Sequence, residues 1–230
     1  MKTPRPTPPD RGFTRTDLCA VLMAIVLLAF IALPALAKMK PYSDRASCLN
    51  NLRQLGIGWH SWAKENRNQP PWYVPVVDGG TKAVPQPFIH FSIISNFVAS
   101  PTIMVCPSDR VKVAARDFSN DPARGLVSLN FQNNAIGYFI GTELAMDEPR
   151  AMMAGDRTVI SAYNGNCGSV GFVTGRLRPP PGWTTESHEG RLGNLLFCDG
   201  SVKTVSDEGL QKAVYNNPVD ANASGCALIP

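Results

Sequence analysis

Cysteines and histidines are the residues of this 230-residue chain best suited to chemistry. The cysteines form no C-x-x-C pair and show no zinc-finger spacing, so the sequence predicts no metal site. Five of them follow the apolar amino-terminal segment and would form at most two disulfides in an oxidising compartment. Spacing does not assign the pairs, and our preferred pairing joins Cys48 to Cys106. The six cysteines are Cys19, Cys48, Cys106, Cys167, Cys198 and Cys226.

A hydrolytic site would need a nucleophile, a base and a group that orients the base. The chain contains no G-x-S-x-G, no H-E-x-x-H, no phosphate-binding loop and no dinucleotide fingerprint. The histidines at 60, 90 and 188 lack the spacing of metal ligands. His188 could meet Asp156 or Asp199 in space, but any chain of this length offers such pairs. We therefore predict that the protein is not an enzyme and needs no cofactor.

Charge limits the classes of partner. The chain has 22 Lys and Arg residues and 18 Asp and Glu residues. The part that follows Ala37 holds 18 of the basic and 16 of the acidic residues, so it is close to neutral and has no basic run. We expect no nucleic-acid partner. The length of this part suits one compact domain.

An uncharged, mostly apolar run from Leu18 to Ala37 follows a short basic lead. A run of this length can cross a bilayer as one helix. Basic residues are balanced on its two sides, so charge does not set the orientation. Ala35-Leu36-Ala37 also fits a signal-peptidase site. A cut after Ala37 would release an exported soluble binding protein or hydrolase, which is the alternative to a retained anchor.

The residues just before the apolar run resemble a type IV prepilin leader. Gly12-Phe13 precedes it, and Asp17 is the fifth residue counted from Phe13. The resemblance implies that a prepilin peptidase cuts between Gly12 and Phe13 and that its N-methyltransferase activity modifies Phe13. The helix would stay in the bacterial inner membrane as a single-pass anchor, with the carboxyl-terminal head in the periplasm. Asp17 would pair with the amino-terminal ammonium of a neighbouring subunit, because a carboxylate among apolar helices needs a partner.

Four further segments resemble pseudopilin-like protein families abundant in Planctomycetes and Verrucomicrobia. They are CLNNLRQLG from Cys48, CPSD from Cys106, AGDR ending at Arg157, and an H-x9-DG-like element from His188 that has ten intervening residues instead of nine. The resemblance implies a structural subunit of a type II secretion or type IV pilus-like system, with other pseudopilins as partners. The motif residues are Cys48, Asn51, Leu52, Gln54, Gly56, Cys106, Pro107, Ser108, Asp109, Gly155, Asp156, Arg157, His188, Gly193, Asn194, Asp199 and Gly200.

The expected fold is α+β and pilin-like, with a long amino-terminal helix packed on a small antiparallel sheet. We expect a leader over residues 1–12, a transmembrane helix over 13–40, its amphipathic continuation over 41–67 and a β-rich head over 68–230. Apolar residues every three or four positions form the inner face of the continuation. Pro41 should kink or break the helix, and Ser43 could cap the next part. The apolar positions are Ala46, Leu49, Leu52, Leu55, Trp59 and Trp62.

Short β-prone runs separated by turn residues predict the strands of the head. They are 102–106, 126–131, 135–140, 151–154, 158–163 and 169–173, while 88–94 is a strand or a short helix. Asp199-Gly200 predicts a two-residue type I′ turn between strands at 194–198 and 201–205. Ser206 should cap a helix that ends near Asn216. Ser108-Asp109 predicts a turn, and we expect Asp156 and Arg157 to form an ion pair that orders a loop.

Overall fold

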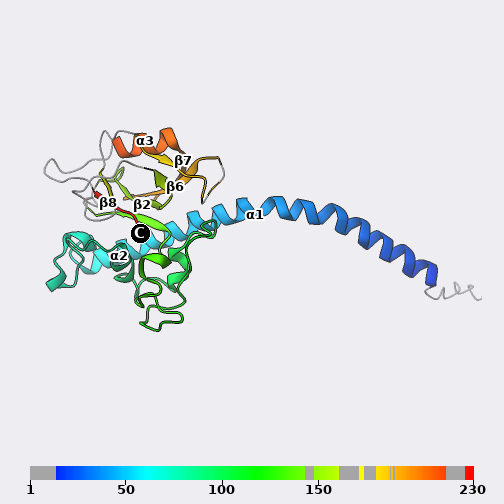
Figure 1. The fold of residues 1–230 in the computed structure, drawn as a ribbon, viewed down its shortest axis with the longest axis horizontal. Coiled ribbons are helices and arrows are strands. Elements are labelled where there is room, and N and C mark those ends of the chain that lie inside the picture. Colours follow the sequence, from blue (N-terminus) through cyan, green and yellow to red (C-terminus); the bar gives the residue numbers. More distant parts are fainter. Residues whose placement is uncertain are drawn as a thin grey trace, which may run out of the picture. The chain divides into compact units, whose positions relative to one another are not determined.

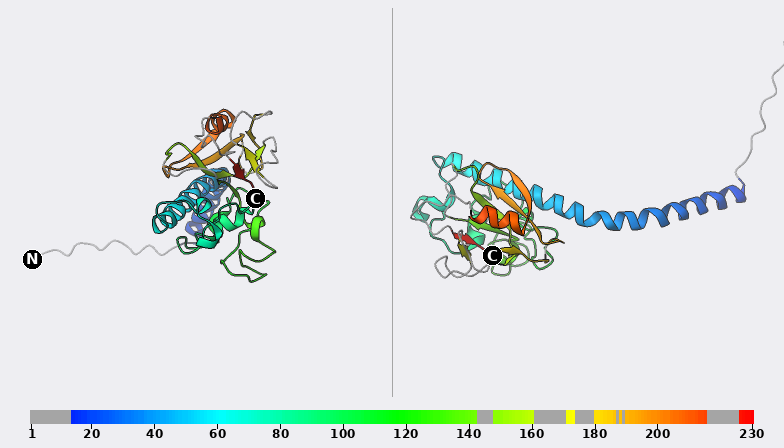
Figure 2. Two further views of the ribbon diagram at one scale, coloured as in Figure 1. Left: turned by 90° about the vertical axis from the view of Figure 1, so that its left-hand side faces the viewer. Right: turned by 90° about the horizontal axis from the view of Figure 1, so that it is seen from above.

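The computed structural model describes residues 14–142, 148–160, 171–173, 180–186, 188, 190–215 and 226–230. The chain divides into two compact units, Met1–Lys40 and Pro41–Pro230, and each is described by itself. Figures 1 and 2 show the ribbon, with residues 14–40 in shades of blue.

Helix α1, Arg15–Glu65, begins in the first unit with a cap formed by its own side chains. The Thr14 N–H donates to Asp17 Oδ2 over 2.9 Å, and the Asp17 N–H donates to Thr14 Oγ1 over 3.2 Å. This reciprocal pair is the capping-box arrangement. The helix has no break at Pro41, and Ser43 lies inside it rather than at a cap. The Ser47 hydroxyl donates to the Ser43 carbonyl within the helix.

In the second unit, α1 packs through the predicted apolar face. Leu52, Leu55, Trp59 and Trp62 are buried, whereas Ala46 at the start of the face is exposed. The helix ends at Glu65 because Arg67 and Asn68 both adopt positive φ angles, which end a right-handed helix.

Six antiparallel strands form the main sheet in the order β4-β8-β1-β2-β6-β7, which confirms the α+β class (Figure 1). The strands are β1 Tyr138–Gly141, β2 Met152–Asp156, β4 Gly171–Val173, β6 Leu192–Phe197, β7 Val202–Ser206 and β8 Cys226–Leu228. A second, two-stranded sheet pairs β3, Val159–Ile160, with β5, Gly182–Trp183.

Alternation along β6 places helices on both faces of the main sheet. Leu196 faces α1, where a Cβ on Gly56 would lie 3.0 Å from the Leu196 side chain. The neighbouring Leu195 instead joins a core cluster with Leu210 and Val214 of α3, Asp207–Tyr215. The expected helix near 206–216 is therefore confirmed, with Leu210 and Val214 inward.

Short helices, rather than strands, are the regular elements between α1 and β1. They are 3₁₀ helices η1 Pro71–Tyr73, η2 Val76–Asp78, η3 Pro101–Met104 and η4 Gln132–Ala135, and α-helix α2 Pro87–Ser92. The strand expected at 102–106 is wrong because Pro101 starts η3 and the Ser100 hydroxyl accepts the Thr102 N–H. The strand expected at 126–131 is also wrong, since its backbone bonds close local turns.

The β6–β7 hairpin is confirmed, but its turn differs from the expectation. The Gly200 N–H donates to the Phe197 carbonyl, and the Phe197 N–H donates to the Ser201 carbonyl, each over 2.9 Å. Gly200 has φ +79°, while Asp199 does not have a positive φ. The loop thus has three residues and ends in one left-handed glycine, the usual three-residue hairpin geometry. A type I′ turn would need positive φ at both residues.

Candidate functional site

Motif residues from four separate segments meet in one buried polar cluster. Helix α1 supplies Cys48, and the segment after η3 supplies Cys106 and Asp109. The end of β2 supplies Asp156 and the adjacent Arg157. His188 precedes β6, and Asn194 lies on it. We call these seven residues the buried polar cluster.

A disulfide joins Cys48 to Cys106 across 58 residues of sequence, as we preferred from the sequence. It ties α1 to the segment that follows η3. One turn further along α1, the Asn51 side chain donates to the Val105 carbonyl over 3.2 Å. Two motif residues of the helix therefore hold the same segment.

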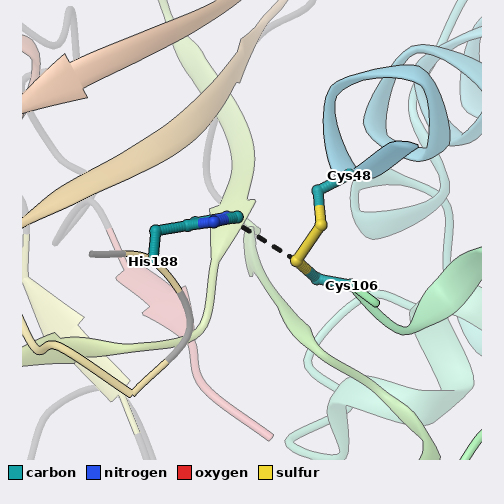
Figure 3. A group of neighbouring side chains, drawn as sticks. All are labelled: Cys48, Cys106 and His188. Atoms are coloured by element: carbon teal, nitrogen blue, oxygen red, sulfur yellow. Dashed lines mark hydrogen bonds between the residues drawn. A yellow bond between two sulfur atoms is a disulfide. The ribbon is translucent and has the colours of Figure 1, made fainter. Parts of the chain in front are cut away.

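The His188 ring approaches the disulfide from the side opposite α1 (Figure 3). Its Nε2 atom lies 3.6 Å from Cys106 Sγ, 3.2 Å from the Asn194 side-chain nitrogen and 3.1 Å from Asp156 Oδ2. Of the two carboxylates that the sequence offered to His188, the structure selects Asp156. Asp199 lies at the other end of β6, in the hairpin loop, and is exposed.

Asp156 Oδ2 is the centre of the hydrogen bonds in the cluster. It accepts the Asn194 backbone N–H over 2.7 Å and the Asn194 side-chain N–H over 3.0 Å. The Thr204 hydroxyl donates to Asn194 Oδ1 over 2.7 Å, which extends the network to β7. Burial, with a further contribution from the Asp156 charge, raises the pKa of the adjacent Tyr138 well above its usual range.

Arg157 binds Asp109 through two bonds. Nε lies 2.5 Å from Asp109 Oδ2, and Nη2 lies 2.9 Å from Asp109 Oδ1. The expected ion pair between Asp156 and Arg157 is therefore wrong, because adjacent residues of an extended strand point to opposite sides. The turn at Asp109 is confirmed, since its N–H donates to the Cys106 carbonyl over 2.8 Å.

Two motif glycines are required by close packing. A Cβ on Gly155 would lie 2.7 Å from the Phe139 ring and from Leu195, and one on Gly193 would lie 2.5 Å from the Trp183 ring. Gly56 faces Leu196 as described above. Leu52 belongs to the core. The other motif residues, Gln54, Pro107, Ser108, Asp199 and Gly200, are half-buried or exposed and are not members of the cluster.

The cluster resembles a metal site only by proximity. The sulfur atoms of Cys48 and Cys106 and a ring nitrogen of His188 all lie within 4.8 Å of one another. Thiolates bind metals, but these two sulfurs are bonded to each other in the disulfide. For the same reason Cys106 offers no nucleophile to His188. The arrangement joins four chain segments through the disulfide and the hydrogen bonds to Asp156 Oδ2, while Asp156 Oδ1 is buried without a hydrogen-bond partner among the described residues.

At the amino terminus, Gly12 and Phe13 lie outside the described residues. Asp17 is described and is exposed. Its carboxylate also accepts the Thr14 hydroxyl over 2.7 Å, and both bonds from Thr14 end on the Oδ2 atom.

Sequence reasoning missed His90, which holds the proline-rich loop that follows α1. Its Nε2 donates to the Val84 carbonyl over 2.9 Å, so its Nδ1 accepts the Thr81 hydroxyl over 2.8 Å. The sequence indicates the burial of His90, because this residue lies between Ile89 and Phe91 in an apolar segment. His60 is half-buried.

Comparison with protein-family models, with curated proteins and with solved structures finds no match to this chain.

Proposed function

We propose that the chain is a pseudopilin-like structural subunit that is anchored in the bacterial inner membrane. In this proposal a prepilin peptidase processes it between Gly12 and Phe13, and copies assemble through α1 in a type II secretion or pilus-like system. The observation that carries the proposal is the span Arg15–Leu33. The most apolar stretch of this part of α1 has a mean hydropathy of 2.6. None of that stretch is buried within the protein.

Exposed apolar surface of this size needs a cover. Met23 and Phe30 are each 75% exposed, and the other large side chains of the span are at least 47% exposed. Leaving such surface in water costs about 25 cal/mol for each Å². Lipid in the membrane, or the same helix of another copy in a filament, supplies an apolar environment.

Asp17 supports assembly rather than simple anchoring. A carboxylate beside an apolar span is costly in a membrane unless it has a partner. The bonds from Thr14 to Asp17 all end on Oδ2, so Oδ1 remains available for a second partner. We propose that this partner is the amino-terminal ammonium of Phe13 in a neighbouring subunit, which would fix the register between copies.

The head would act as a rigid scaffold in the periplasm. Six members of the buried polar cluster are buried, and Arg157 is nearly so, with its side chain 13% exposed. Substrate would not reach the His188–Asp156 pair without opening the core. We therefore propose that the cluster stabilises the head and is not catalytic.

One observation favours a second candidate, an exported soluble binding protein. The head forms a compact unit over Pro41–Pro230. Cleavage after Ala37 would leave this unit whole, including its disulfide. The two candidates differ in the first residue of the mature chain, which is Phe13 for the subunit and Lys38 for the released protein.

Substitution of Asp17 tests the assembly step. We expect Asp17→Ala and Asp17→Asn to leave the head folded but to abolish cross-linking between copies in the membrane fraction, because both remove the charge. Thr14→Ala is the matched control, since it removes the cap and keeps the carboxylate. Cross-linking that survives Asp17→Asn, or that is lost equally in Thr14→Ala, would contradict the proposed role.

A further inference from the structure

A pocket of about 490 Å³ opens on the head beside the β6–β7 hairpin. Its wall is formed by the turn before β2, the hairpin and residues of α3. This volume lies within the range of about 300 to 1,000 Å³ that is typical of small-ligand sites. None of the buried polar cluster lines it.

The charged side chains that line the pocket are mostly basic. Arg150, Lys203 and Lys212 face a single acid, Asp199. None of the three cations forms an ion pair with another group in the described part of the chain. Asp199 is engaged by its own loop, since its Oδ1 accepts the Ser201 N–H over 2.8 Å. Three cations and one carboxylate therefore line the hollow, which leaves it with a net positive charge.

Two of these cations are held by regular structure. Lys203 is on β7, and its Nζ lies 5.3 Å from the centre of the Phe197 ring, which is within the range of a cation–π contact. Lys212 is on α3, which is fixed by the buried side chains of Leu210 and Val214. Gly209 brings α3 close to β7, because a Cβ there would lie 2.7 Å from Val205 Cβ.

We propose that this pocket binds a phosphate or sulfate monoester. A guanidinium matches the oxygens of such a group with two parallel bonds, and ammonium groups supply further point charges. The volume leaves room for a sugar-sized group that carries the oxyanion. The inference goes beyond the proposed function and does not depend on it, because the pocket belongs wholly to the unit Pro41–Pro230.

The test is calorimetric titration of the full chain in non-ionic detergent micelles. Glucose 6-phosphate and glucose 6-sulfate serve as probes, inorganic phosphate and sulfate as the free anions, and glucose as the neutral control. We expect saturable binding of at least one ester, with one ligand for each chain, and no binding of glucose. Equal affinity for the free anions would assign the site to the anion itself, and tighter binding of an ester would assign it to the ester.

Variants separate the pocket from general attraction of charge. Arg150→Gln and Lys212→Gln should each weaken binding about tenfold, the equivalent of one charge-assisted hydrogen bond. Lys82→Gln, at an exposed position that does not line the pocket, should leave binding unchanged. Asp199→Asn should tighten binding, a gain that a folding defect would not produce. Absence of saturable binding up to about 10 mM ligand, a weak affinity by any standard, would overturn the proposal. An equal loss in Lys82→Gln would overturn it as well.

Discussion

Arg157 and Asp109 form a buried ion pair of the buried polar cluster. Their side chains are 13% and 1% exposed. Removing one partner of such a pair leaves a buried charge without compensation, which costs about 3 to 5 kcal/mol. We predict that Arg157→Met lowers the free energy of unfolding of the head by this amount, measured by urea denaturation.

Arg124 is the control for this prediction. It pairs with Asp117 and Asp121 at the surface, where the side chains are 59% and 38% exposed. Exposed pairs of this kind contribute about 0 to 1 kcal/mol, so Arg124→Met should change stability by no more than that. Similar losses in the two variants would show that the buried pair has no special weight.

At the scale of single residues, the sequence motifs named every member of the cluster but only some of its contacts, among them the disulfide. The members that the motifs named are Cys48, Cys106, Asp109, Asp156, Arg157, His188 and Asn194. The hydrogen-bond partners of Asp156 and Arg157 were set by the backbone at the end of β2, which turns the two side chains to opposite sides. Such a choice depends on neighbouring strands and segments, which no single motif contains.

His90 of α2 forms hydrogen bonds to Thr81 and Val84 in the loop that precedes the helix. The stability that these contacts provide should depend on pH. Burial lowers the pKa of His90 from its ordinary value of 6.5, while the hydrogen bond to the Val84 carbonyl opposes the shift. The unfolded chain therefore takes up a proton at a higher pH than the folded chain. Stability is fully present above about pH 6.5 and falls as the pH drops towards the lower folded-state pKa.

We predict that the stability advantage of the wild type over His90→Gln shrinks as the pH falls from about 7.5 to about 5. The advantage is the difference in free energy of unfolding between the two proteins, measured at each pH. Other titrating groups cancel in this difference. An advantage that stays constant or grows on acidification would contradict the burial of His90 as a neutral ring.

At the scale of elements, long periodic or paired patterns were predictable and short apolar runs were not. The inner face of α1 and the β6–β7 pair are confirmed because their patterns repeat over several residues. The run at 102–106 became η3 through Pro101 and the Ser100 cap, and the run at 126–131 has no strand partner. In both places, local hydrogen bonds decided the structure over β propensity.

At the scale of the whole head, the disulfide between Cys48 and Cys106 closes a loop of 58 residues. A cross-link over a loop of this length removes about 4 kcal/mol of chain entropy from the unfolded state. We predict that the double variant Cys48→Ala/Cys106→Ala loses about 2 to 5 kcal/mol of unfolding free energy, or fails to fold at 37 °C.

Cys19 provides the control for the disulfide. It lies exposed in the apolar span of α1, outside the head. Cys19→Ala should leave the unfolding of the head unchanged, as followed by its tryptophan fluorescence. A disulfide-free head as stable as the wild type would show that the cross-link is dispensable for the fold.

The α+β class and the amino-terminal apolar helix could be predicted from the sequence, since both follow from patterns along the chain. The basic pocket could not, because Arg150, Lys203 and Lys212 are separated in sequence and meet only through the packing of α3 on the hairpin. The position of amino-terminal cleavage also concerns the whole molecule, because it decides whether the apolar span remains attached to the head.

The most direct test is the mass of the amino-terminal peptide of the mature protein, recovered separately from the membrane and soluble fractions of its native host. The proposed subunit should begin at Phe13 and carry one methyl group on its amino terminus. A mature chain that begins at Lys38 and is recovered in soluble form would contradict the proposal of an anchored, assembling subunit.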